Sequence, residues 1–219
     1  MTGVKFSESD LRMSEVAYLP TGKRELTKVA NRQAILDAAR EVFGELGYET
    51  STVRDIIRRT GLAAGTFYNY YRSKEEVYVA LSDEGARQFA PLLKAQRAQS
   101  ANWEEFVHAA IEAYFLFLGD AHKSWLARRP PGELYPHVHG ETPEMAAVFN
   151  EVREAIVDEI ARGGAPDADP DYVAAACIAI AREVGEKMLA RRPIDTKGAT
   201  EFAVAMIQGG LQSLPKSKA

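Results

Sequence analysis

The chain has 219 residues, of which 46% are hydrophobic and 26% charged, and its formal net charge is −4. This composition excludes a disordered chain and leaves room for one large or two small domains. The single cysteine, Cys177, excludes an internal disulfide framework and a cysteine-based metal cluster. No apolar run approaches transmembrane length, and the N-terminus lacks the hydrophobic region of a signal peptide. We therefore expect a soluble, cytoplasmic protein with no membrane partner.

Charge is distributed unevenly along the chain. Residues 23–74 contain ten lysines and arginines and six aspartates and glutamates, so this stretch carries +4 and the remainder carries −8. Phosphate contacts depend on the local field rather than on the net charge of the whole protein. The pattern therefore predicts a basic nucleic-acid-binding module attached to an acidic body.

Residues 1–27 show no sustained hydrophobic periodicity, which predicts a flexible N-terminal arm. Two interpretations stay open for the cations Lys23, Arg24 and Lys28 at its end. They contact the DNA backbone or minor groove, or they belong to a solvated tail.

The first helix is expected from about Val29 to Leu46, because apolar residues recur there at steps of three and four. Gly47 closes it. Its predicted role is to hold the following two helices at a fixed angle.

The stretch from Ser51 to Val77 predicts two short helices with a tight turn and the start of a longer third helix. Thr52 is a good N-cap that Asp55 completes as a capping box, and Gly61 is placed to end the helix in a left-handed conformation. A second helix is expected over 64–71. The third opens with the capping pair Ser73 and Glu76, and two short helices around a glycine turn are typical of a helix-turn-helix.

The second short helix carries polar chemistry and no acidic residue. Hydroxyl groups there can donate to phosphate oxygens, and Asn69 can pair with a base edge, most naturally adenine. Phe67 and Tyr71 are expected on its buried side. The alternative interpretation is a helical hairpin with aromatic packing.

The sequence STVRDIIRRTGLAAGTFYNYYRSKEEVYVAL resembles the N-terminal signature of TetR-type (tetracycline-repressor-like) transcriptional regulators. The resemblance covers roughly residues 28–81, and beyond them the chain matches such regulators only in length and helical character. It implies an all-α fold in which a three-helix DNA-binding domain with a helix-turn-helix is joined to a larger ligand-binding and dimerisation domain. The expected division is 1–27 for the arm, 28–75 for the DNA-binding domain and 76–219 for the body.

The resemblance and the residue chemistry together predict a set of DNA-binding residues. These are Thr52, Arg54, Ala64, Gly65, Thr66, Tyr68, Asn69, Tyr70 and Lys74. Lys74 is expected at a helix N-terminus, where its charge and the helix dipole both favour a phosphate contact. One departure from the family pattern is that Ala63 and Ala64 stand where a Ser or Thr cap and a Lys are common, so the other residues must contribute more.

The remaining chain predicts a helical body. The helix that opens at Ser73 is expected to reach about Ala95, and the next runs from the cap Asn102 until Gly119 and Asp120 end it. A short helix around Trp125 and further helices over about 143–162, 170–190 and 197–214 follow, two of them opened by Thr142-Pro143 and Asp169-Pro170.

Aromatic residues are concentrated in the body and predict an effector pocket, although each is individually more typical of core. The candidates are Phe106, Tyr114, Phe115, Phe117, Trp125, Met145 and Phe149. Such a cavity favours an apolar or aromatic effector.

The loop over 130–142 contains His137 and His139, with His122 upstream. A His-x-His pair with no third ligand specified does not predict a metal site, and surface or pocket-rim histidines are the favoured interpretation. No nucleophile elbow, P-loop or dinucleotide fingerprint is present, so the sequence predicts neither an enzyme nor a cofactor.

The resemblance implies a repressor that a small effector releases from a palindromic operator in double-stranded DNA. It also implies a homodimer through the last two long helices, about 170–191 and 197–213, whose small residues suit close packing. Two alternatives stay open: a helical DNA-binding regulator without a small-molecule ligand, and a ligand-binding helical protein that no longer binds DNA.

Overall fold

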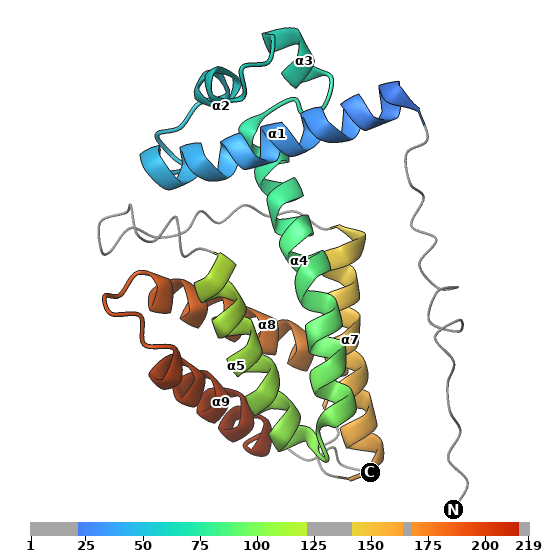
Figure 1. The fold of residues 1–219 in the computed structure, drawn as a ribbon. Helices are drawn as coiled ribbons and strands as arrows, with labels where there is room; N and C mark the ends of the chain where they lie inside the picture. Colours follow the sequence, from blue (N-terminus) through green and yellow to red (C-terminus); the bar gives the residue numbers. More distant parts are fainter. Residues whose placement is uncertain (1–21, 122–141, 164–167, 215–219) are drawn as a thin grey trace, which may run out of the picture.

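The computed structural model describes residues 22–121, 142–163 and 168–214, which form eight helices and no strand. Figure 1 shows a three-helix unit, α1 to α3, at one end of the molecule and a helical body at the other. The long helix α4 connects the two. The all-α fold that the sequence predicts is therefore confirmed.

Helix α1 spans Lys23–Leu46, so it begins six residues before the Val29 start that the sequence predicts. Residues 23–27, expected in the arm, are helical. The reason is local: these residues are mostly good helix formers, whereas the apolar periodicity that marks a helix begins only where α1 meets the core, at Ile35. Gly47 ends α1 as expected, at φ 81°.

Helices α2 (Val53–Thr60) and α3 (Ala64–Tyr68) form the helix-turn-helix. The predicted capping box is present, because the Thr52 side chain accepts from the Asp55 N–H and the Asp55 carboxylate accepts from the Thr52 N–H. Gly61 adopts φ 68°, the left-handed conformation that glycine tolerates best. Helix α3 ends three residues earlier than predicted, since Asn69 is its C-cap.

Helix α4 spans Lys74–Gln99 and α5 spans Trp103–Ala121. Ser73 and Asn102 cap them as predicted, each accepting from the N–H three residues on. The Glu76 carboxylate accepts from the Arg72 N–H rather than completing a capping box with Ser73. The prediction that Gly119 and Asp120 end α5 is wrong, because both lie within the helix. Glycine lowers helix stability by only about 1 kcal/mol, which tertiary packing offsets.

The rest of the body comprises α7 (Pro143–Ala161), α8 (Pro170–Leu189) and α9 (Thr196–Gln212). Thr142 and Asp169 cap α7 and α8, each with proline at the first helical position, as predicted. The predicted helix around Trp125 lies outside the described residues. None of the described helices is long and apolar enough to cross a membrane.

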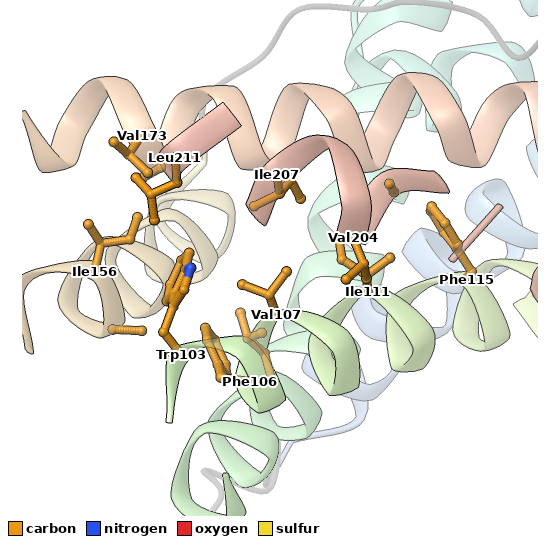
Figure 2. Close-up of a cluster of buried hydrophobic side chains, with 14 of the residues drawn as sticks. Trp103, Phe106, Val107, Ile111, Phe115, Ile156, Val173, Val204, Ile207 and Leu211 are labelled. Atoms are coloured by element: carbon orange, nitrogen blue, oxygen red, sulfur yellow. The ribbon is translucent and has the colours of Figure 1, made fainter. Parts of the chain in front are cut away.

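Two separate hydrophobic cores account for the two units. The first packs α1, α2 and α3 against the start of α4, through residues such as Ile35, Phe67 and Val77. The second joins α5, α7, α8 and α9 with the later part of α4; Figure 2 shows its side chains around Trp103 and Phe106. Helix α4 contributes to both cores, through Val77 and Tyr78 at its start and Phe89 and Leu93 further on.

Salt bridges also join α4 to its neighbours. The guanidinium of Arg97 contacts Glu151, Glu154 and Asp158 on α7 at 2.5–3.0 Å. Near the other end of α7, Arg87 contacts Glu144 at 3.1 Å. These pairs hold α4 and α7 together along their length, beside one another in Figure 1.

Candidate nucleic-acid interface

The start of α2 and the outer side of α3 form an exposed surface that contains most of the predicted DNA-binding residues. Exposed members are Thr52, Arg54, Ala64, Gly65, Tyr68 and Asn69, and half-buried members are Thr66 and Tyr70. No acidic residue occurs between Asp55 and Glu75. A Cβ at Gly65 would meet nothing within 4 Å, so a ligand backbone can approach α3 closely there.

The opposite side of α3 anchors it. Phe67 is 1% exposed and Tyr71 7%, whereas Tyr68 is 57% exposed. The rings of Phe67 and Tyr68 meet edge to face, with centroids 5.4 Å apart. The predicted division of α3 into a buried and an exposed side is therefore confirmed, and it directs Tyr68 and Asn69 outward from a rigid base.

The arginines near this surface differ in their partners. Arg59 is held against α1 by Glu41 at 2.7 Å and by Glu45. Arg40 contacts Asp37 and Glu84 at 2.5 Å each. Both guanidinium groups are thus neutralised within the protein, which leaves other cations to form the positive surface.

Among the cations without such close carboxylate partners, Arg54, Arg58 and Arg72 are exposed near α2 and α3, and Lys23, Arg24 and Lys28 are exposed on α1. Arg58 lies 3.7 Å from Asp55, a loose surface pair that constrains it little. A surface with three exposed arginines and no acidic residue on α3 suits the phosphate backbone of DNA.

Lys74 is directed into the protein. Its Nζ donates to the carbonyl oxygens of Tyr48, Glu49 and Ser51 at 2.8, 3.3 and 3.2 Å. It also lies 4.4 Å from the centroid of the Tyr48 ring. In this structure the three N–H groups that the sequence assigned to phosphate are used on the turn between α1 and α2.

Hydrogen bonds within the α2 cap also affect titration. The Thr52 hydroxyl lies 2.5 Å from Asp55 Oδ2. This hydrogen bond is the main reason why the pKa of Asp55 is lowered, with smaller contributions from the Thr52 N–H, Arg58 and Arg54. Asp55 is consequently ionised and fixed as a cap over the neutral pH range.

The predicted effector-pocket residues divide into two groups. Phe106 and Phe115 are buried in the body core. Tyr114, Phe117, Met145 and Phe149 are only partly buried. Trp125 lies outside the described residues.

Two members of the partly buried group, Tyr114 and Phe117, pack against α4. The Phe89 ring on α4 contacts the rings of Tyr114 and Phe117 on α5, with centroids 5.2 and 5.6 Å apart. Burial raises the pKa of Tyr114 to about 12, while Arg182 acts to lower it and Glu186 to raise it. Arg182 and Glu186 on α8 therefore lie close enough to Tyr114 to act on its hydroxyl group.

A small cavity at the opposite end of the body was not predicted. Its volume is about 260 Å³, and its lining consists of Asn102, Trp103, Glu104, Glu159, Gln208, Leu211 and Gln212. The indole N–H of Trp103 is buried and has no hydrogen-bond partner within the described part of the chain. No sequence signal marks this cavity, because its walls come from three separate helices.

Apolar side chains are exposed along α8 and α9. Tyr172 is 77% exposed, Phe202 58% and Met206 51%. Ala175, Ala176 and Ala179 on α8, and Ala205, Gly209 and Gly210 on α9, are exposed as well. Small residues interspersed with large apolar ones are typical of a helical face that packs closely against another protein chain.

Across the described residues, no group of three or more His, Cys, Asp or Glu side chains is arranged to hold a metal ion. His122, His137 and His139 lie outside those residues. Burial raises the pKa of Cys177 to about 12, so this thiol is protonated and packs as a small apolar group.

Known proteins resemble this chain at two levels. Residues 35–81 match the family model of the bacterial regulatory proteins, tetR family. The HTH-type transcriptional activator FasR of Mycolicibacterium smegmatis is 26% identical over 199 residues, which cover 88% of each chain. The fatty acid metabolism regulator protein of Bacillus subtilis is 34% identical over 88 residues, 40% of this chain and 45% of that relative. The chain thus spans less than half the length of this second relative.

Solved structures share the fold. The transcriptional regulator FadR from Bacillus subtilis, in complex with stearoyl-CoA, superposes with a TM-score of 0.61 at 19% identity, over 84% of this chain and 99% of that one. The match lies over both the helix-turn-helix unit and the body. Residues 35–81 thus carry the N-terminal domain of the tetR family of bacterial regulatory proteins, and the chain is similar to FasR along most of its length.

Proposed function

We propose that this protein is a cytoplasmic homodimeric regulator that binds a palindromic operator in double-stranded DNA and leaves it when a small effector binds the body. The observation that carries the proposal is the surface of α2 and α3. It presents exposed arginines, hydroxyls and an amide, contains no acidic residue on α3, and rests on a buried aromatic base.

The proposed contacts fall into two classes. Arg54, Thr66 and Tyr70 supply donors for phosphate oxygens, which fix the position of the protein on the duplex. Thr52 lies beside them, and its hydroxyl donates to Asp55 Oδ2, so its part is to hold the start of α2. The exposed Tyr68 and Asn69 are placed to reach base edges in the major groove, and Asn69 can form the bidentate pair with adenine. Ala64 and Gly65 have little or no side chain, so they permit α3 to approach the duplex closely enough for Asn69 to reach a base edge.

Dimerisation is proposed through the exposed apolar faces of α8 and α9. Tyr172, Phe202 and Met206 would be covered by the same helices of a second copy, which forms a four-helix interface. A two-fold axis there would set two copies of α3 into successive major grooves about 34–36 Å apart.

The effector is proposed to be a long-chain acyl compound, such as an acyl-CoA. Two observations support this class. The partly buried aromatic surface around Tyr114 and Phe117 suits an apolar chain. The Bacillus subtilis FadR with a similar fold is in complex with stearoyl-CoA.

Helix α4 is the proposed route of the signal, because it belongs to both cores. An effector that binds one α4 position better than the other shifts the distance between the two DNA-binding units. The shift in operator affinity cannot exceed this difference in effector affinity.

Release from an operator relieves repression where the operator overlaps a promoter. The relative that matches along most of its length, FasR, is an activator, so activation is the second candidate. In vitro transcription from a promoter carrying the bound sequence separates the two. We expect the protein to lower transcript yield, and a raised yield would favour activation.

Fluorescence anisotropy of a bound duplex tests the effector. Stearoyl-CoA is expected to release the DNA and to raise the unfolding temperature, whereas coenzyme A without the acyl chain should do neither. At a ligand concentration of 100 times Kd the expected stabilisation is about 2.7 kcal/mol. Absence of release and of stabilisation with acyl chains of every length would favour a regulator without this ligand class.

A further inference from the structure

Lys74, the first residue of α4, lies beside the turn between α1 and α2. An ammonium group has three N–H donors, and here the Nζ lies within 2.8–3.3 Å of three main-chain carbonyl oxygens, those of Tyr48, Glu49 and Ser51. All three N–H donors of this lysine therefore have acceptors in one turn of the main chain.

The surroundings of Lys74 strengthen this arrangement. Its Nζ lies 4.4 Å from the centroid of the Tyr48 ring, close enough for a cation–π contact. The Tyr48 hydroxyl donates to Glu75 Oε1 at 3.2 Å, and the Ser51 hydroxyl donates to the Tyr48 carbonyl at 2.7 Å. Tyr48 and Ser51 are buried, so water has little access to the carbonyl oxygens on their side of the turn, whereas the contact with Glu49 is exposed. The first turn of α4 and the turn between α1 and α2 thus form one rigid piece.

The position of this piece relates it to DNA. Ser51, whose carbonyl accepts from Lys74, directly precedes Thr52, the N-cap of α2. The hydrogen bond therefore fixes the point at which α2 begins relative to α4, and with it the directions of Thr52 and Arg54.

We propose that Lys74 is a positioning residue for DNA reading: it sets α2 and α3 on the end of α4 and makes no phosphate contact of its own. The inference rests on the proposed function, since DNA binding is what the positioning serves. It replaces the phosphate contact that the sequence predicts for Lys74. It also gives α4 a direct link to the N-terminus of α2, so a displacement of α4 reaches the DNA-binding surface through these three hydrogen bonds.

The test compares Lys74→Met and Lys74→Arg with Arg72→Ala, which removes an exposed cation of the DNA-binding surface. Lys94→Met, which removes an exposed lysine of the α4 body segment, is the matched control. Affinity for a selected operator and for a random duplex is measured at several salt concentrations. Each phosphate contact contributes about 0.9 to the slope of log K against log salt.

For a positioning role, Lys74→Met keeps the wild-type salt slope but lowers the ratio of operator to random-duplex affinity by about tenfold or more, comparable to a wrong base pair. Arg72→Ala is expected to lower the salt slope and to leave the ratio of operator to random-duplex affinity unchanged. Lys94→Met should change neither the slope nor the ratio. Lys74→Arg does not restore the ratio, because a planar guanidinium cannot direct its donors to three converging oxygens. Equal losses on both duplexes, a lower slope and rescue by arginine would show a phosphate contact and overturn the inference.

Amide hydrogen exchange in the absence of DNA tests the inference separately. The measurement is local, so it remains informative even for a variant whose overall stability is reduced. In Lys74→Arg, amides of residues 50–56 are expected to exchange faster than in the wild type, while those of α8 and α9 keep their protection. Unchanged protection at 50–56 would overturn the positioning role. If the wild-type protein selects no DNA, the proposed function fails instead, and the exchange comparison still decides whether Lys74 holds the turn.

Discussion

At the scale of single residues, the DNA-binding surface separates positions that hold the unit together from positions that face outward. Arg59 and Lys74 look alike in sequence to Arg54 and Arg72, yet the first two are bound to partners within the protein. Only exposed side chains without such constraints are free to take part in recognition. The predictions for individual residues follow from this division.

Asn69→Ala is expected to relax base preference, because the exposed amide is the group best suited to a bidentate contact with adenine. The loss should be about 1–3 kcal/mol on the preferred operator and near zero on operators altered at the contacted base pair. Binding to a panel of single-base operator variants measures it. An equal loss on every sequence would count against a base-reading role.

Thr52→Ala is expected to lower the free energy of unfolding by about 1 kcal/mol at neutral pH, since it removes the α2 capping box. The Thr52 hydroxyl is also the main cause of the lowered pKa of Asp55. A lowered folded-state pKa contributes stability above the unfolded-state pKa of about 4, and this stability is lost as pH falls through the folded value.

The difference between Thr52→Ala and the wild type should therefore shrink as pH falls below about 4. Denaturant unfolding from pH 7 to pH 3 measures it. Thr27→Ala, which removes a hydroxyl bonded to a main-chain carbonyl on exposed α1, serves as the control without a carboxylate partner. A Thr52→Ala difference that stays constant over the whole pH range would contradict the coupling.

At the scale of elements, close helix packing in the body depends on Gly185 in α8. A Cβ there would lie 2.8 Å from Leu118 Cδ1 and 3.2 Å from Phe115 Cε1 on α5. The side chain of Phe115 is fully buried, so it has little room to move. The absence of a side chain at residue 185 thus sets the distance between α5 and α8.

Gly185→Ala is expected to destabilise the protein by about 1–2 kcal/mol, because overpacking outweighs the gain in helix propensity. Gly85→Ala on α4 is the matched control: nothing lies within 4 Å of its Cβ, so it should stabilise by about 0.5–1 kcal/mol. Chemical denaturation of both variants measures the contrast. Similar stabilisation by the two substitutions would argue against the close approach of α5 and α8.

Local signals predicted much of this structure, and tertiary contacts account for what they missed. Capping at Thr52, Asn102, Thr142 and Asp169 involves residues a few positions apart, so sequence suffices to find it. The early start of α1 and the continuation of α5 through Gly119 lack such a signal. The inward direction of Lys74 and the three α7 carboxylates around Arg97 depend on residues far away in sequence, which spacing cannot reveal.

At the scale of the whole molecule, reading of a palindromic operator requires two copies of the chain. A single helix-turn-helix unit offers a short recognition surface, since α3 has only five residues. Two units joined through α8 and α9 would double the contacts and impose a fixed spacing on the two half-sites. Operator binding and dimerisation should therefore be lost together.

Phe202→Glu is expected to give a monomer, because it places a charge in the middle of the exposed apolar face of α9. Sedimentation shows the change of mass, and operator affinity should fall by at least about tenfold, since the second half-site is no longer held in place. Leu116→Glu, at an equally exposed leucine on α5, is the control and should remain a dimer. A Phe202→Glu protein that remains a dimer would place the interface elsewhere.

Selection of bound fragments from random duplex DNA at near-physiological salt tests whether two copies of the chain read one operator. We expect a palindromic motif with half-sites about one helical turn or slightly more apart, as two copies of α3 on a two-fold axis would read. Bound fragments with no shared motif, or with a single unrepeated half-site, would contradict a dimeric sequence-specific regulator.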